Sequence, residues 1–209
     1  MIPLTQALAL SAFVATAAAA DSPYKLGTRD EIIASTRTLA ADLVAFYKGN
    51  QTGETPGIIS QLPPTGDYYW DTSAHYWATL LDYWKVTGDE SYNPIIAQAL
   101  QFQRGSNDNY MPLNWTATIA NSDQCVWAMA ALSAAENKFP GPPSGGVPWL
   151  KLAENVFDTQ ASRWEREAGV NRTCEGGLRW QIPLSNLGYN WKDSELRSLS
   201  EPDVEEGCQ

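Results

Sequence analysis

The segment 70–84 constrains the fold most, because its large apolar side chains recur at the spacing of a helix. The row consists of Trp70, Ala74, Trp77, Leu81 and Trp84, at intervals of four and three residues. Such a row lies along one face of an α-helix and has to be buried against other elements. It predicts a helix from Thr72 or Ser73 to Thr87, closed by Gly88.

Four further segments carry helical signals, and none shows the clear alternation of a strand. Thr28 and Glu31 have the spacing of a capping box, and apolar rows or an early proline mark the others. The four helices run from the capping box to a stop at Lys48–Asn50, from Pro94 to before Gly105, from Ser122 to Asn137 and from Trp149 to Glu167. The loops between them are polar and aromatic. The pattern predicts an all-α fold of helical hairpins.

The two ends of the chain differ from its middle. Residues 1–20 combine an apolar run with a cluster of small residues before Asp21, which predicts a signal peptide. Residues 21–192 read as the folded domain, and residues 193–209 as a disordered or aberrant acidic tail. No stretch is long and apolar enough to predict a transmembrane segment.

Secretion also agrees with three sequons, at Asn50, Asn114 and Asn171. The expected localisation is therefore extracellular. Cys125, Cys174 and Cys208 make an odd number, so one internal disulfide at most can form, and its pairing stays open.

Charge narrows the choice of partners. With 14 Lys and Arg against 24 Asp and Glu, the net charge is −10, which argues against nucleic acid and anionic membranes. A single His and the lack of paired cysteine spacings give no support for a metal, and no glycine motif predicts a nucleotide. We expect no cofactor. A neutral or cationic ligand remains open, and the oligomeric state is not determined by the sequence.

Acids, amides and aromatic rings gather in the loops, which would meet at one end of a helical array. This combination is typical of sugar sites, because rings stack on pyranoses and a carboxyl pair breaks the glycosidic bond. The expected catalytic positions are Asp123 and Ser122. The expected substrate-binding residues are Tyr69, Trp70, Asp71, Tyr110, Asn121, Gln124, Trp127, Arg179 and Trp180.

Each of these assignments has a structural alternative. Asp123 opens a helix, where an acid also serves as a cap for backbone N–H groups. Trp77, Trp84 and Trp164 lie on helical rows, and core packing is the favoured interpretation for them. For Trp70, Trp127 and Trp180, packing and sugar stacking are about equally supported.

Several ordered segments resemble the fungal branch of glycoside hydrolase family 76, the endo-α-1,6-mannanases and cell-wall mannosidase-like proteins. The resemblance runs from about Tyr24 to Lys192, and its motifs include Leu81–Trp84, Thr87–Asp89 and Gly177–Gln181. It implies a partial (α/α)6 barrel, an incomplete toroid that comprises the N-terminal half of such a domain. It also implies retaining hydrolysis or transglycosylation of α-1,6-mannan in the cell wall, without a metal.

The chain departs from the family pattern at the acids. Where the family has Asn-Asp-Asp-Gln, this sequence has Asn121-Ser122-Asp123-Gln124. The resemblance assigns Asp123 as general acid/base, whereas the nucleophile position holds Ser122, whose hydroxyl does not readily replace a carboxylate. The family's Tyr-Trp-Trp-Glu-Ala-Gly corresponds to Tyr69-Trp70-Asp71-Thr72-Ser73-Ala74, in which the acid, Asp71, is displaced by one position.

Two alternatives to an active mannosidase therefore stay open. One is a mannan-binding homologue that does not cleave its ligand. The other is a truncated fragment without activity, whose missing helices would leave apolar faces uncovered.

Overall fold

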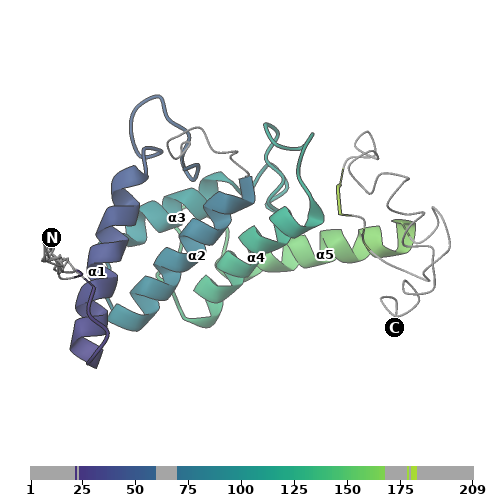
Figure 1. Cartoon of the computed structure of the whole chain (residues 1–209). Helices are drawn as coiled ribbons and strands as arrows, with labels where there is room; N and C mark the ends of the chain where they lie inside the picture. Colours follow the sequence, from purple (N-terminus) through teal and green to yellow (C-terminus); the bar gives the residue numbers. More distant parts are fainter. Residues whose placement is uncertain (1–21, 23, 60–69, 168–177, 179, 183–209) are drawn as a thin grey trace, which may run out of the picture.

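The computed structural model describes residues 22, 24–59, 70–167, 178 and 180–182. This part contains five α-helices and no named strand, which confirms the all-α prediction. The helices are α1 (Arg29–Phe46), α2 (Trp70–Thr87), α3 (Asn93–Phe102), α4 (Asn121–Glu136) and α5 (Trp149–Glu167) (Figure 1). The predicted bounds of α5 and the predicted end of α2 agree with these, and the other predicted bounds differ by a few residues. The predicted signal peptide and acidic tail lie outside the described residues.

The start of α1 follows its sequence signal. The N–H of Glu31 donates to the Thr28 hydroxyl at 3.2 Å, and the N–H of Thr28 donates to the Glu31 carboxylate at 2.9 Å. This reciprocal pair is the predicted capping box. Two backbone donors that the helix leaves open are thereby satisfied.

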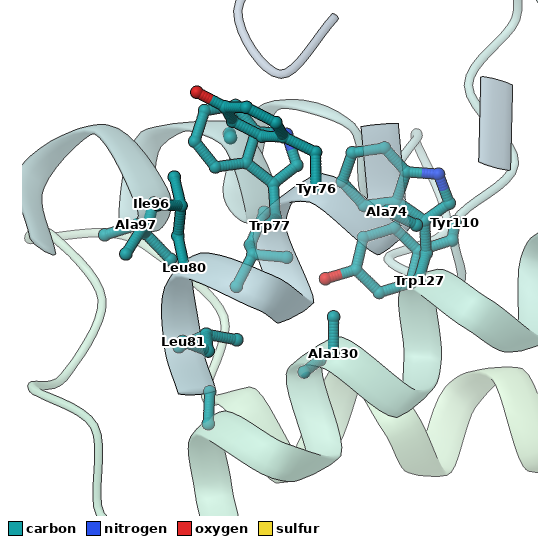
Figure 2. Close-up of a cluster of buried hydrophobic side chains, with 14 of the residues drawn as sticks. Ala74, Tyr76, Trp77, Leu80, Leu81, Ile96, Ala97, Tyr110, Trp127 and Ala130 are labelled. Atoms are coloured by element: carbon teal, nitrogen blue, oxygen red, sulfur yellow. The ribbon is translucent and has the colours of Figure 1, made fainter. Parts of the chain in front are cut away.

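Trp77 lies at the centre of the core formed around α2 (Figure 2). Its indole is fully buried and meets Tyr47 and Tyr76 edge-on, with ring centroids 4.8 and 4.7 Å apart. The indole N–H donates to the Gly57 carbonyl at 2.8 Å, and the Gly57 N–H donates to the Tyr47 hydroxyl at 3.0 Å. One side chain thus anchors α1, α2 and the loop between them.

Helices α2 and α4 run side by side, and their first turns lie at the same end (Figure 1). Small side chains at Ala74, Ala130 and Ala134 are buried and allow the two helices to approach closely. Where the first turns meet, Trp70 stacks on Trp127 with ring centroids 5.0 Å apart. The pair forms the layer against which α1, α3 and α5 pack.

Helix α5 buries only part of the apolar surface that its sequence offers. Leu152 and Val156 are buried, but Trp164 is 50% exposed and Phe157 is 72% exposed. The prediction that Trp164 packs in the core is therefore wrong. Within the described part of the chain only α4 packs extensively on α5, and the opposite face is left uncovered.

The turn after α2 is held by a carboxylate and yields a prediction. Asp89 accepts hydrogen bonds from the Tyr83 hydroxyl and from the Ser91 N–H, the latter at 2.9 Å. Hydrogen bonds from Ser91 and then Tyr83 are the main reasons that the pKa of Asp89 falls from 3.8 to about 2.

Replacing Asp89 with Asn should remove a stabilising contribution that depends on pH. A lowered folded-state pKa stabilises the protein above pH 3.8, and this contribution is lost as the pH falls toward 2. We expect Asp89→Asn to cost about 1 kcal/mol at pH 7, because the carboxylate is partly solvated. Urea unfolding at several pH values measures this. The difference from the parent should shrink at pH 2, and the exposed neighbour Glu90→Gln is the control.

Candidate active site

Asp123 lies in the first turn of α4, with its side chain half-buried. One carboxyl oxygen accepts the N–H of Ala120 at 2.8 Å. Ala120 is the N-cap residue and has no side-chain acceptor of its own, so the carboxyl of Asp123 serves the helix end. The capping interpretation is thus confirmed, and it leaves the second carboxyl oxygen oriented toward Ser122.

The pKa of Asp123 is raised above its ordinary value. Burial is the largest cause, and the negative charge of Asp71 raises the pKa further. The hydrogen bonds from Ala120 and Ser122 act in the opposite direction but do not cancel it. A carboxyl group that keeps its proton above the usual range is suited to act as a general acid.

Ser122 is exposed, and its side chain contacts two other residues of the predicted site, Asp123 and Trp180. Its hydroxyl donates to Asp123 at 3.3 Å and accepts the indole N–H of Trp180 at 3.1 Å. Trp180 is 52% exposed, so its ring is accessible beside the acid. These three side chains therefore form an open polar and aromatic surface at the start of α4.

A short backbone pairing brings Trp180 to this place. The N–H of Asn121 donates to the carbonyl of Trp180 at 2.8 Å, and the N–H of Ile182 donates to that of Ile119 at 3.1 Å. An isolated antiparallel bridge between Ala120 and Gln181 lies between the two bonds.

Asn121 and Gln124 were expected to bind substrate, but their side chains point into the protein. Gln124 is fully buried, and its amide donates to the Asn109 carbonyl at 2.6 Å. The side-chain oxygens of Asn121 and Gln124 both accept hydrogen bonds from the guanidinium group of Arg163. The bond to Gln124 is 2.8 Å long. Because these polar atoms are used within the protein, the two residues position the start of α4, and the expectation of direct binding is corrected.

Arg163 and Gln160 of α5 are parts of the site that sequence reasoning did not assign. Gln160 donates to the Asn121 carbonyl at 2.8 Å, and Arg163 also contacts the Met111 sulfur at 3.1 Å. One signal was present in the sequence, since Gln160 interrupts an otherwise apolar helical row that includes Leu152 and Val156. A polar side chain on a buried row needs a partner, and here the partner is the site's own backbone.

Three aromatic residues of the predicted site belong to the core instead. Trp127 is fully buried between Trp70 and Tyr110, with ring centroids 5.0 and 5.5 Å away. Tyr110 is fully buried and Trp70 is 3% exposed, so a sugar has no access to any of these rings in this arrangement. The expectation that they stack on substrate is corrected, because the three rings are buried against one another in the core.

The remaining predicted residues are placed only in part. Asp71 lies in the first turn of α2 and is half-buried. Tyr69 and Arg179 lie outside the described residues, as does Asn171. The sequon residues Asn50 and Asn114 are exposed, and so is Cys125.

A groove of about 710 Å³ lies away from these acids, on α3 and the adjoining loops. It is lined by Pro94, Ile95, Gln98, Gln101, Phe102, Arg104, Gly105 and Pro143, and so by none of the predicted site residues. In the described part of the chain, no three His, Cys, Asp or Glu side chains gather as a metal ion requires. None of the described helices has the length and apolar character that a membrane crossing needs.

An all-α layer with a carboxyl of raised pKa and an exposed indole at one end is an arrangement that suits glycoside hydrolases. The model of Glycosyl hydrolase family 76 matches residues 31–196, and the chain belongs to this family. The helices are similar to the crystal structure of Dfg5 from Chaetomium thermophilum in complex with glucosamine, with a TM-score of 0.72 and 50% identity over 81% of this chain and 41% of that one. This confirms the predicted partial barrel.

Curated relatives are also similar in sequence to this chain. The chain is 42% identical to mannan endo-1,6-alpha-mannosidase DCW1 of Candida glabrata, over 77% of this chain and 34% of the relative. It is 34% identical to mannan endo-1,6-alpha-mannosidase DFG5 of Saccharomyces cerevisiae, over 80% and 34%. The chain thus spans about a third of the length of these relatives.

Proposed function

We propose that this chain acts on α-1,6-mannan of the cell wall as an endo-mannosidase, with Asp123 as its general acid/base. The observation that carries the proposal is the half-buried carboxyl of Asp123, whose pKa is raised beside an exposed indole. A carboxylic acid of this kind can protonate the oxygen of a departing sugar. Trp180 offers a ring on which a neighbouring mannose stacks.

The relatives support the choice of substrate. Relatives with the printed name mannan endo-1,6-alpha-mannosidase match 77% and 80% of this chain. The family model matches residues 31–196, the segment that contains Ser122, Asp123 and Trp180. The predicted signal peptide and the exposed Asn50 and Asn114 support action outside the cell. The localisation that we propose is secreted and associated with the cell wall.

Binding without cleavage is the second candidate, and Ser122 is the observation that favours it. The hydroxyl of Ser122 is held between Trp180 and Asp123, at a place where the family pattern has a carboxylate. A hydroxyl in this position does not stabilise a developing positive charge at the anomeric carbon as a carboxylate does.

Incubation of the purified full chain with linear α-1,6-mannan separates the two candidates. Release of mannose oligomers supports the hydrolase. Calorimetric binding of α-1,6-mannotetraose without release supports the binding protein. The absence of both would contradict each candidate.

A carboxylate at position 122 should raise turnover. We expect Ser122→Asp to increase the rate on the order of 10²-fold, because it restores a second acid beside Asp123. The indole N–H of Trp180, which now donates to Ser122, can donate to the new carboxylate. Initial rates on α-1,6-mannotetraose labelled at its reducing end measure the effect, with Ser122→Ala as the control. An unchanged rate in Ser122→Asp would contradict the assignment of this position.

A further inference from the structure

Arg163 of α5 bonds to two amide side chains that lie on either side of Asp123 in the sequence. Its guanidinium group donates to the side-chain oxygen of Asn121 and to that of Gln124, the latter at 2.8 Å. Asn121 is 6% exposed and Gln124 is fully buried, so both side chains are shielded from water. Their oxygens therefore depend on donors within the protein. The contact ties α5 to both sides of the acid.

The guanidinium group also determines which way these amides face. It can only donate, so Asn121 and Gln124 have to present their oxygens to it. The amide nitrogen of Gln124 is then free to donate to the Asn109 carbonyl, which it does at 2.6 Å. The Nη1 atom of Arg163 serves both amide oxygens, and its Nη2 atom contacts the Met111 sulfur at 3.1 Å. A planar group bonded in this way holds the first turn of α4 in one orientation.

The backbone of Asn121 connects α5 with both parts of the candidate site. Its carbonyl accepts the amide of Gln160 at 2.8 Å, and its N–H donates to the Trp180 carbonyl at 2.8 Å. Two residues later in the same turn, the carboxyl of Asp123 accepts the N–H of Ala120 at 2.8 Å. The position of this carboxyl is set by the first turn of α4, and that turn is bonded to α5 through backbone and side chains.

The loop that Gln124 contacts has an uncommon backbone conformation. Asp108 and Tyr110 have φ angles of 52° and 54°, in the left-handed region that residues other than Gly seldom adopt. Such a backbone persists where its surroundings hold it, and it is frequent at functional sites. The carbonyl of Asp108 accepts the amide of Asn155 at 3.1 Å, and that of Asn109 accepts Gln124. Helix α5 thus supports this loop as well as the start of α4.

We propose that Arg163 is a positioning residue for the general acid Asp123 and that it acts by holding the side chains of Asn121 and Gln124. This inference rests on the proposed function and concerns the same site. A misplacement of a reacting group by about 1 Å can cost on the order of 10²-fold in rate. The exposed ring of Trp180 is held by bonds in which Arg163 takes no part. Loss of Arg163 should therefore affect the rate more than the binding of substrate.

Turnover by the full chain tests this role. We expect Arg163→Met, which keeps the length of the side chain but has no donor, to lower kcat on α-1,6-mannan by on the order of 10- to 100-fold with little change in KM. Arg163→Lys keeps the charge but not the planar group, so it should recover part of the loss.

Leu152→Ala is the matched control on the same helix. Leu152 is fully buried, so the substitution weakens the packing of α5 without removing a bond to either amide. We expect kcat near that of the parent chain. Full activity of Arg163→Met, or an equal loss of kcat in Leu152→Ala, would overturn the proposal while the proposed function stands.

Amide hydrogen exchange needs no turnover and separates the two claims. The N–H of Ala120 bonds to the carboxyl of Asp123, and the N–H of Asn121 bonds to the Trp180 carbonyl. In Arg163→Met both amides should exchange faster by on the order of 10-fold, because two buried oxygens lose their donor and the turn opens more often. In Leu152→Ala their exchange should stay at the parent rate.

An inactive parent chain would contradict the proposed hydrolysis, and exchange then decides the role of Arg163. Parent-like exchange of Ala120 and Asn121 in Arg163→Met would overturn that role. Faster exchange at these amides, with little change in the middle of α2, would support it. If Arg163→Met does not fold, Arg163→Lys takes its place with smaller changes expected, and parent values of both kcat and exchange would count against the proposal.

Discussion

Replacing Asp123 with Asn is expected to reduce release of oligomers from α-1,6-mannan by about 10²- to 10⁴-fold, the range that a general acid contributes. The amide keeps the shape of the carboxyl and still accepts the N–H of Ala120, which Asp123 now binds at 2.8 Å. It cannot donate a proton to a departing sugar oxygen. The loss should therefore appear in kcat with the fold intact, as initial rates and thermal unfolding measured together would show.

The matched control is Asp30→Asn, since Asp30 is an exposed acid in the first turn of α1. It repeats the chemical change at another helix start. The raised pKa of Asp123 also predicts how turnover depends on pH. Turnover of the parent chain should fall as the pH rises through that pKa, because the general acid loses its proton. Turnover by Asp123→Asn equal to that of the parent would remove Asp123 from the reaction.

Replacing Trp77 with Ala should cost about 3–5 kcal/mol of folding free energy, the range for deleting a buried aromatic side chain. The fully buried indole packs against Tyr47 and Tyr76, and its N–H donates to Gly57. The substitution leaves a cavity and an unpaired carbonyl in the core. Urea unfolding of the full chain measures the change.

Trp164→Ala removes the same atoms from a half-exposed position on α5 and is the control. It should cost far less, because much of the ring is already in water. Similar losses in the two variants would contradict the placement of Trp77 at the centre of the core.

The helices were predictable because their signals are local. The capping box of Thr28 and Glu31 and the row of tryptophans in α2 depend on neighbours in sequence, and both have their expected form. Uncovered apolar faces were also expected of a truncated fragment, although not on a particular helix. The exposure of Trp164 was not, because burial depends on which element packs on that face and no local pattern gives this.

The candidate site was predictable at its acid but not in its surroundings. Asp123 opens α4 as expected, and Trp180 lies beside it. A ring beside an acid in the sequence can equally be a sugar platform or a packing element, and Trp127 is the latter. Arg163 reaches Asn121 across 42 positions of sequence, a contact that only the packing of α5 on α4 creates.

The contact between Ser122 and Trp180 has a consequence for how the protein folds. These residues are 58 positions apart, whereas each helix forms from neighbours in sequence. Bringing distant segments together costs chain entropy that local helix formation does not require. We therefore expect the helices to form early in folding. The exposed surface beside Asp123 should form late, and it should open at a lower free energy than the core.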